Sequence, residues 1–375
     1  MATINGTSGN DTLYGTTSAD TINGLDGDDT LFGYDGDDWL DGGLGADTMY
    51  GGLGNDYYIV DDAGDVVDEA SGEGNDTVRT TLASYILTAN VEYLEFVGSG
   101  DFTGEGNELN NQIYGAAGND VLYGYDGHDA LWGNDGDDSL YGGSGHDTLI
   151  GGLGADYMEG NDGDDAYMVD DVGDTVVELS GEGDFDIVYT SVSTYTLPNE
   201  IENLYWNSYG SFNGTGNALN NIINSGGSND VLSGGDGDDE LRSSAGNDIL
   251  DGGDGNDYLN GSAGADTYTG GAGSDLIQIG FFESGNGVNA DRITDFATGV
   301  DTIDVSLWDA NRLVAGNQAF TWIGGSAFSG TAGELRTYFD GVDTWVQADR
   351  NGDMIADFEI LFDGSVSLAG SDFIL

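Results

Sequence analysis

The chain contains no cysteine, no lysine, one proline and only two histidines among its 375 residues. Without cysteine it has no disulfide, no thiol nucleophile and no thiolate zinc site. It also lacks the HExxH motif of zinc proteases and the G-x-S-x-G motif of serine hydrolases. His128 and His146 cannot form a zinc site by any familiar spacing, and we interpret them as turn residues. The sequence therefore predicts a protein that is not an enzyme.

Positive charge is also scarce. Six arginines stand against 70 aspartates and glutamates, which gives a formal net charge of −64. A compact chain with this charge repels itself unless cations neutralise part of it. The charge excludes nucleic acid and anionic membranes as expected partners.

Long apolar runs are missing as well. No stretch of 18 apolar residues occurs, so no membrane span is predicted. The N-terminus shows no charged segment followed by an apolar stretch, so we expect no cleaved signal peptide.

What the chain does contain is a nine-residue unit, G-x-x-G-x-D-x-U-x, in which U is a large apolar residue. It occurs eighteen times, in blocks of six over residues 6–59, 115–168 and 225–278. The eighth position is always Leu, Ile, Met or Tyr, and the sixth is always Asp. These aspartates are Asp11, Asp20, Asp29, Asp38, Asp47, Asp56, Asp120, Asp129, Asp138, Asp147, Asp156, Asp165, Asp230, Asp239, Asp248, Asp257, Asp266 and Asp275.

A fixed period of this length predicts a solenoid. The first six positions are rich in Gly, Asn and Asp and suit turns, and the last three suit a very short strand. Successive units would alternate between two parallel sheets, with the eighth position pointing inward from both. We therefore predict an all-β fold, a right-handed parallel β-roll or β-helix solenoid of nonapeptide repeats.

In such a coil, units n and n+2 lie about 4.8 Å apart, so their carboxylates and turn carbonyls converge. Calcium takes 6–8 oxygen ligands and suits such clusters better than zinc or copper does. The sequence predicts multiple bound Ca²⁺ ions, held by the eighteen aspartates and by turn glycines. The candidate glycines are Gly9, Gly27, Gly36, Gly118, Gly127, Gly136, Gly237 and Gly255.

The repeats resemble those of RTX (repeats-in-toxin) proteins, bacterial exoproteins exported by type I secretion systems. After the third block, residues 290–306, 327–336 and 349–364 look like the C-terminal domain of serralysin-type metalloproteases, without the protease catalytic domain. This resemblance implies a β-rich capping domain and secretion to the extracellular space through the type I machinery. The last four residues are similar to the family's secretion signal: Asp372, Phe373, Ile374 and Leu375.

Two related segments, 60–114 and 169–224, separate the blocks and show that a unit of roughly 110 residues is duplicated. We expect them to continue the coil with longer turns or looped-out insertions. Predicted domains are 1–114, 115–224, 225–282 and a C-terminal domain over 283–375. Further candidate calcium ligands in the separating segments are Asp61, Asp62, Asp65, Asp170, Asp171 and Asp174.

Two features of the C-terminal part stand outside the repeat. Residues 281–296 carry only hints of it, and 306–314 is predicted to be helical, with Ser306 as N-cap and Asp309 completing a capping box. A further loop resembles a calcium site without the full EF-hand spacing. Its candidate ligands are Asp349, Asn351, Asp353 and Asp357.

Aromatic residues recur at the ninth position of alternate units, where they should stack on the outer face of one sheet. They are Tyr14, Phe32 and Tyr50, and then Tyr123 and Tyr141; Trp132 should lie on the opposite sheet. Such a ladder suits binding of polysaccharide or of another copy of the roll, or it serves only cross-strand packing.

Together these features favour a secreted calcium-binding β-roll protein that folds on meeting extracellular Ca²⁺ and acts as a structural or adhesive component of a cell surface or matrix. One alternative is a non-catalytic module related to secreted metalloproteases or epimerases. Another is a polysaccharide-binding protein that uses the aromatic ladder.

Overall fold

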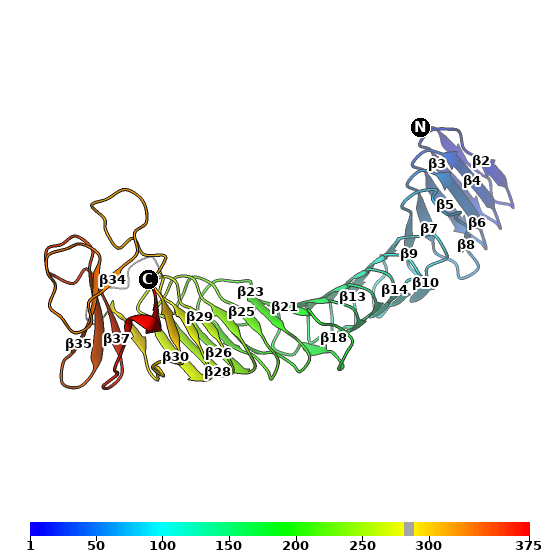
Figure 1. Ribbon diagram of the computed structural model, residues 1–375. Helices are drawn as coiled ribbons and strands as arrows, with labels where there is room; N and C mark the ends of the chain where they lie inside the picture. Colours follow the sequence, from blue (N-terminus) through cyan, green and yellow to red (C-terminus); the bar gives the residue numbers. More distant parts are fainter. Residues whose placement is uncertain (281–288) are drawn as a thin grey trace. The chain divides into compact units, whose positions relative to one another are not determined.

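A computed structural model describes residues 1–280 and 289–375 (Figure 1). Part of the segment with only hints of the repeat, 281–288, lies outside the described residues, as does the expected domain boundary at 282/283. The chain divides into two compact units, Met1–Asp186 and Ile187–Leu375. The four domains expected from the sequence remain a prediction.

In the first unit, odd-numbered strands form one parallel sheet and even-numbered strands form two others. The odd-numbered strands are β1 (Thr3–Asn5), β3 (Thr21–Asp26), β5 (Trp39–Leu44), β7 (Tyr57–Val60), β9 (Thr77–Thr80), β11 (Tyr93–Phe96), β13 (Gln112–Ala117), β15 (Ala130–Asp135), β17 (Thr148–Leu153) and β19 (Ala166–Val169). One even-numbered sheet contains β2 (Thr12–Tyr14), β4 (Thr30–Asp35), β6 (Thr48–Leu53) and β8 (Val66–Val67). The other contains β10 (Ser84–Ile86), β12 (Thr103–Glu105), β14 (Val121–Asp126), β16 (Ser139–Ser144), β18 (Tyr157–Asp162) and β20 (Thr175–Val177).

The strand register confirms the predicted solenoid. Thr21 pairs with Trp39 in the sheet of β3 and β5, and Thr12 pairs with Thr30 in the sheet of β2 and β4. Both steps are 18 residues, so one turn of the coil takes two nonapeptides. The eighth-position residues Leu31 and Leu40 are fully buried between the sheets, as the period-2 alternation of a strand requires.

The segment between the first two blocks continues the coil, as expected. In it Tyr57 pairs with Thr77, Thr77 with Tyr93, and Tyr93 with Gln112, so the turns take 20, 16 and 19 residues. The second unit repeats the last two steps, because Ile187 pairs with Asn203 and Asn203 with Ile222. One of these irregular turns is thus shorter, not longer, than a regular one.

The second unit also has two sheets. One contains β21 (Ile187–Thr190), β23 (Asn203–Trp206), β25 (Ile222–Asn224), β27 (Glu240–Arg242), β29 (Tyr258–Asn260), β31 (Leu276–Gln278), β33 (Thr302–Asp304) and β38 (Phe373–Ile374). The other contains β22 (Thr194–Thr196), β24 (Asn213–Thr215), β26 (Val231–Asp236), β28 (Ile249–Asp254), β30 (Thr267–Ala272), β32 (Asp291–Ile293), β37 (Phe358–Phe362), β36 (Thr344–Asp349), β35 (Glu334–Phe339) and β34 (Thr321–Trp322).

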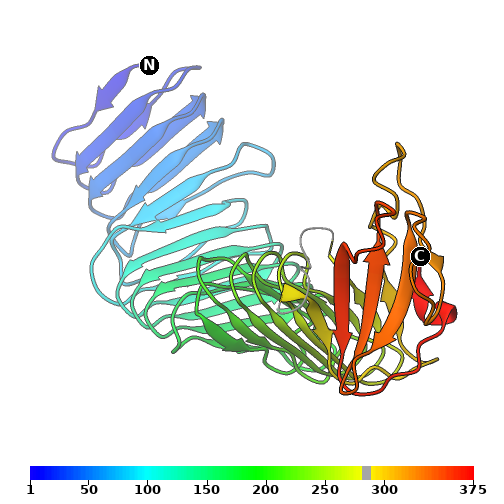
Figure 2. The same cartoon turned by 90° about the vertical axis from the view of Figure 1, so that its left-hand side faces the viewer.

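The C-terminal strands cap the second unit. β37 pairs parallel with β32, and then β36 pairs antiparallel with both β37 and β35, which ends the solenoid pattern (Figure 2). Trp308 stacks on Phe358 in the core under these strands, with ring centroids 4.5 Å apart. A solenoid needs its last apolar layer covered, and these strands cover it.

The helix predicted over 306–314 is wrong. This stretch is turns and bends, and no α-helix occurs anywhere in the described residues; a 3₁₀ turn, η2, spans Gly370–Asp372. Trp308 is buried and its indole N–H donates to the Ile279 carbonyl oxygen at 3.0 Å. The Asp309 carbonyl oxygen accepts from the Arg350 guanidinium at 2.7 Å. These tertiary contacts override a local helix propensity that is weak by nature.

Candidate metal sites in the repeat turns

The sixth-position aspartates lie in the turns, and most of them are buried although they are charged residues. Asp29 and Asp38 are each 2% exposed, and Asp47 and Asp56 are fully buried. Most of them follow a fourth-position glycine that the turn forces into left-handed backbone, as at Gly27 with φ +117°. Glycine is needed there because a Cβ on Gly27 would lie 2.8 Å from backbone atoms of the adjacent turn.

One carboxylate oxygen of each aspartate forms a ladder between turns. The Asp29 N–H donates to Asp47 Oδ1 at 2.7 Å, and the Asp38 N–H donates to Asp56 Oδ1 at 2.7 Å. The same 18-residue bond recurs in the second and third blocks, for example from Asp138 to Asp156 at 2.8 Å. The ladder orients the aspartates so that the second oxygen of each points into the turn.

That second oxygen, Oδ2, is buried and accepts no hydrogen bond from the protein in fifteen of the eighteen repeat aspartates. The fifteen are Asp29, Asp38, Asp47, Asp56, Asp129, Asp138, Asp147, Asp156, Asp165, Asp230, Asp239, Asp248, Asp257, Asp266 and Asp275. An unpaired buried carboxylate oxygen is costly unless a cation meets it.

The exceptions have donors. Asp11 Oδ2 accepts from the backbone N–H and the hydroxyl of Thr7, and Asp20 Oδ2 accepts both from Thr16. Asp120 Oδ2 accepts from the Ala116 N–H at 2.9 Å. These three predicted ligands therefore already have protein partners.

The first-position glycines complete a cradle of oxygens. A Cβ on Gly24 would overlap both Asp29 Oδ2 and the Gly42 carbonyl oxygen. A Cβ on Gly33 would likewise overlap Asp38 Oδ2 and a carbonyl oxygen of the next turn. A carboxylate oxygen and a backbone carbonyl thus converge at the space that the missing side chain leaves, and such hard oxygen donors suit Ca²⁺.

Electrostatics agree with this geometry. Burial, followed by the charges of neighbouring aspartates, raises the pKa of Asp56 and of Asp156 to about 7. Burial and the charge of Asp291 raise the pKa of Asp266 to about 8. Without a cation, many turn carboxyls would bind protons near neutral pH; a bound divalent ion would remove this penalty.

An internal comparison supports the same interpretation. In the turn at 106–111 the sixth position is Asn111, whose Oδ1 accepts from the Asn107 N–H at 2.7 Å and whose amide donates to the Val91 carbonyl oxygen at 3.1 Å. Asn221 makes the same pair of bonds with Asn217 and Ile201. These neutral turns satisfy themselves with hydrogen bonds, which the aspartate turns do not.

The glycines predicted as ligands occupy the fourth position, next to the ladder. The Gly27 and Gly36 carbonyl oxygens face Gly45 and Gly54 of the following turns. The structure places first-position carbonyl oxygens, such as that of Gly42, closest to the unpaired carboxylate oxygens. Sequence spacing did not separate these two sets of glycines, and the fourth-position set remains a prediction.

Sequence reasoning also missed a second ladder at the fifth position. The Asp28 N–H donates to Asn10 Oδ1 at 3.1 Å, and the Ala46 N–H donates to Asp28 Oδ1 at 3.1 Å. His128 Nδ1 accepts from the His146 N–H at 2.7 Å, so histidine replaces Asn or Asp in this ladder. The two histidines are turn residues, as interpreted from the sequence.

The carboxylate ladder extends beyond the regular repeats. Asp65 and Asp174, two predicted candidates, accept from the N–H groups of Asp47 and Asp156 at 3.0 and 3.1 Å. The other four candidates of the separating segments, Asp61, Asp62, Asp170 and Asp171, are exposed. The sequence prediction missed four further ladder members, which are Asp76, Asp186, Asp291 and Asp301. The half-motif D-x-U, as in Asp76-Thr77-Val78, was the signal that could have found them.

The candidate loop of the C-terminal part is closed by its own hydrogen bonds. Asp349 accepts from the N–H groups of Gly352 and Met354 at 2.6 and 2.8 Å. Asp357 accepts from the Arg350 N–H at 2.6 Å and from the Asn351 amide at 3.0 Å, and Asp353 is exposed. The loop brings Asp349, Asn351 and Asp357 together, and calcium there remains a prediction.

The final residues form part of the sheet. Phe373 pairs with Ile303 and stacks against Trp322, with ring centroids 4.9 Å apart. Asp372 is 2% exposed and accepts from the Ala369 N–H at 2.8 Å. These contacts give the C-terminal segment a structural role, and its role as a secretion signal remains a prediction.

The aromatic residues stack as expected. Ring centroids of Tyr14 and Phe32 lie 5.3 Å apart, and those of Phe32 and Tyr50 lie 4.9 Å apart. In the second block Tyr123 and Tyr141 stack at 4.9 Å on β14 and β16. Trp132 lies in β15 on the opposite sheet and stacks on Tyr114.

No helix within the described residues is long and apolar enough to cross a membrane. A search of curated proteins found no match. Among solved structures, the chain is similar to the AlgE6R3 subunit of the mannuronan C5-epimerase from Azotobacter vinelandii, with 26% identity over 42% of this chain and 78% of that chain. The TM-score of 0.22 is too low for this likeness to inform the function.

The profile of the RTX calcium-binding nonapeptide repeat matches just over half of the chain. The matched residues are 5–37, 23–58, 105–140, 132–167, 141–176, 215–250 and 242–277. They cover most of the repeat blocks in which the structure places the buried carboxylate ladder. On its repeats, its fold and this match, the chain belongs to the family of RTX calcium-binding nonapeptide repeat proteins.

Proposed function

We propose that this protein is an extracellular calcium-loaded scaffold that leaves the cell through a type I secretion system and folds when it meets Ca²⁺. It would then act as a structural or adhesive component of a cell surface or matrix. The observation that carries the proposal is the set of fifteen buried aspartate oxygens that accept no hydrogen bond from the protein.

The charge balance supports folding that depends on calcium. The formal net charge is −64, and the buried aspartates repel one another across adjacent turns. A ligand that binds only the folded chain stabilises it in proportion to its concentration. Sites of extracellular modules bind calcium at about 10⁻⁴–10⁻³ M, a range met outside cells. The absence of cysteine suits such a path but does not require it.

The test is a calcium titration of an EDTA-stripped sample, followed by circular dichroism and by hydrodynamic radius, with magnesium as the control. We expect a cooperative gain of β signal and a compaction with calcium alone. A chain that is already compact without calcium would contradict the proposal.

The stacked aromatics favour a second candidate, polysaccharide binding. Tyr123, Tyr125 and Tyr141 line a groove of about 370 Å³ together with Glu159 and Asn161. Aromatic faces beside polar side chains suit sugar rings. In the first block, the double variant Tyr14→Ala/Phe32→Ala should lose binding on a glycan array if its ladder binds sugar. Unchanged binding would limit that ladder to cross-strand packing.

A further inference from the structure

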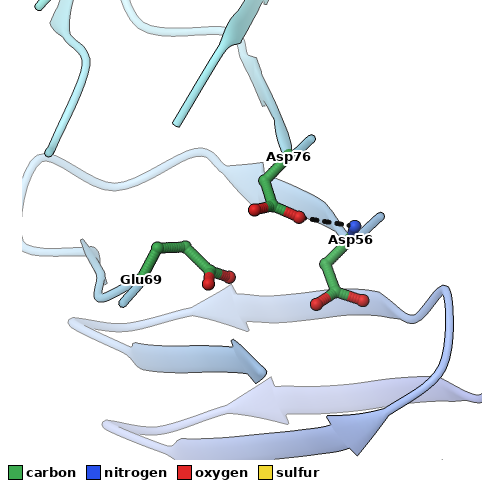
Figure 3. Close-up of side chains that lie close together, drawn as sticks. All are labelled: Asp56, Glu69 and Asp76. Carbon is green, nitrogen blue, oxygen red and sulfur yellow. Dashed lines mark hydrogen bonds between the residues drawn. The ribbon is translucent and has the colours of Figure 1, made fainter. Parts of the chain in front are cut away.

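A glutamate from the segment between the first two blocks reaches the carboxylate ladder. The carboxylate oxygens of Asp56, Glu69 and Asp76 include one from each residue that all lie within 4.8 Å of one another (Figure 3). Asp56 is fully buried, Glu69 is 6% exposed and Asp76 is 1% exposed. Asp76 Oδ1 accepts from the Asp56 N–H at 2.8 Å, so Asp76 continues the ladder, whereas Glu69 comes from outside it.

The unpaired state of Glu69 points to a ligand. Both of its carboxylate oxygens are buried and accept no hydrogen bond from the protein, and the same holds for Oδ2 of Asp56 and of Asp76. Four acceptor oxygens thus face one another with no donor between them. Three carboxylates at this distance cannot all be ionised without a cation, because like charges in a buried site repel strongly.

A buried tyrosine adds a further oxygen. The hydroxyl of Tyr58 is buried and makes no hydrogen bond, and a Cβ on Gly51 would overlap both this hydroxyl and Asp56 Oδ2. The hydroxyl therefore lies beside the carboxylates, and the glycine leaves the space between them open.

The duplicated segment builds the same group a second time. Asp165, Glu178 and Asp186 are buried and meet the same distance criterion. Here the Tyr167 hydroxyl donates to Glu178 Oε1, while Glu178 Oε2 accepts no hydrogen bond from the protein. The two groups agree residue by residue even though the segment that supplies the glutamate is the irregular part of the coil.

We propose that these two groups are calcium sites of their own, Asp56–Glu69–Asp76 and Asp165–Glu178–Asp186, and that they bind Ca²⁺ more tightly than the regular repeat turns do. The choice of calcium rests on the proposed function; the presence of a cation rests on the geometry. More ligand charge raises affinity for calcium, and an oxygen-only set disfavours softer metals. A filled site fastens each separating segment to the end of its repeat block.

The test compares Glu69→Gln with Asp68→Asn in the full chain. The first substitution keeps the shape of the side chain and removes its charge, and Asp68 is the exposed neighbour whose substitution removes one charge outside the group. Bound calcium is measured by equilibrium dialysis at a series of free calcium concentrations. We expect Glu69→Gln to lose one of the tightest ions or to weaken it about tenfold or more. Asp68→Asn should match the parent, and Glu69→Gln/Glu178→Gln should lose two ions.

Terbium provides a second readout, because tyrosine close to bound Tb³⁺ sensitises its luminescence. Tyrosine-sensitised emission at the lowest Tb³⁺ additions should fall in Glu69→Gln and remain in Asp68→Asn. If Glu69→Gln does not fold at saturating calcium, Glu69→Asp, which keeps the charge, should restore folding; failure of both would overturn the inference.

The outcomes separate this inference from the proposed function. A parent chain that binds no calcium would sink the proposed function. A parent that binds calcium normally while Glu69→Gln behaves like Asp68→Asn would sink only the inference, and Glu69 would then be a buried acid that is neutral in the folded chain.

Discussion

At the residue scale, the two oxygens of one aspartate do different work. Oδ1 of Asp29 accepts from the Asp11 N–H at 2.6 Å and holds the turn, and Oδ2 is left for a cation. Asparagine retains the first acceptor and loses the charge of the second, so the two functions can be separated by a single substitution.

We therefore expect Asp29→Asn to remove one calcium ion or to weaken it by roughly tenfold or more, because a charged ligand is lost. Asp28→Asn is the matched control, since Asp28 is exposed and its Oδ1 serves only the fifth-position ladder. Calorimetric titration with calcium checks both variants. Equal loss in the two variants would show that the effect reflects overall charge.

Backbone strain is a second feature of single residues. Leu25 and Tyr34 hold left-handed backbone, with φ of +86° and +80°, at the position where the paired residues are Gly43 and Gly52. Such a conformation costs a side-chain-bearing residue roughly 1–2 kcal/mol.

Leu25→Gly should thus raise the free energy of unfolding of the calcium-loaded protein by up to about 1 kcal/mol, after the entropy of the unfolded glycine is counted. Leu44→Gly is the control, because Leu44 is also exposed but does not have positive φ. It should lower the same free energy by roughly 0.5–1 kcal/mol. Urea unfolding measures both, and a loss of stability in both would contradict the strain argument.

At the scale of the element, stacking of turns decides which glycines are needed. Gly27 has φ +117° and would place a Cβ 2.8 Å from backbone of the previous turn, whereas a Cβ on Gly9 meets nothing within 4 Å. Both glycines occupy the fourth position of their units. Only a turn that has another turn packed on it is constrained in this way.

Gly27→Ala should therefore lower stability by about 2 kcal/mol or more, and Gly9→Ala should change it by less than about 1 kcal/mol. Thermal unfolding in saturating calcium compares the two. Similar losses would mean that the template itself, and not the stacking of turns, requires glycine at the fourth position.

At the scale of the whole molecule, the buried carboxyls couple folding to pH. Burial raises the pKa of Asp129 and of Asp239 to about 7 and that of Asp165 to about 8, above the value near 4 of an unfolded chain. The folded state therefore binds more protons than the unfolded state. Protonation stabilises the metal-free fold below these values, and that contribution is lost as the pH rises through about 6–8.

We expect the chain in EDTA to become more compact and to gain β signal as the pH falls from about 8 to about 5. Calcium affinity should weaken over the same range, since protons compete for the carboxylates. Hydrodynamic radius and calcium binding at constant ionic strength report the two effects. A metal-free chain that expands on acidification would refute the assignment of these carboxyls as buried and unpaired.

The sequence by itself determined the solenoid, its 18-residue turn and its inward-facing apolar positions, because each follows from a short period that repeats in register. It also identified the sixth-position aspartates as the acidic row of the turns. Tertiary structure alone decided which oxygens remain unpaired, since Asp11, Asp20 and Asp120 find donors and Asp29 does not. It alone brought Glu69 to Asp56, because the irregular 20-residue turn between Tyr57 and Thr77 has no template in the repeat. It also replaced the expected helix at 306–314 with turns, since burial of Trp308 outweighs a weak local preference.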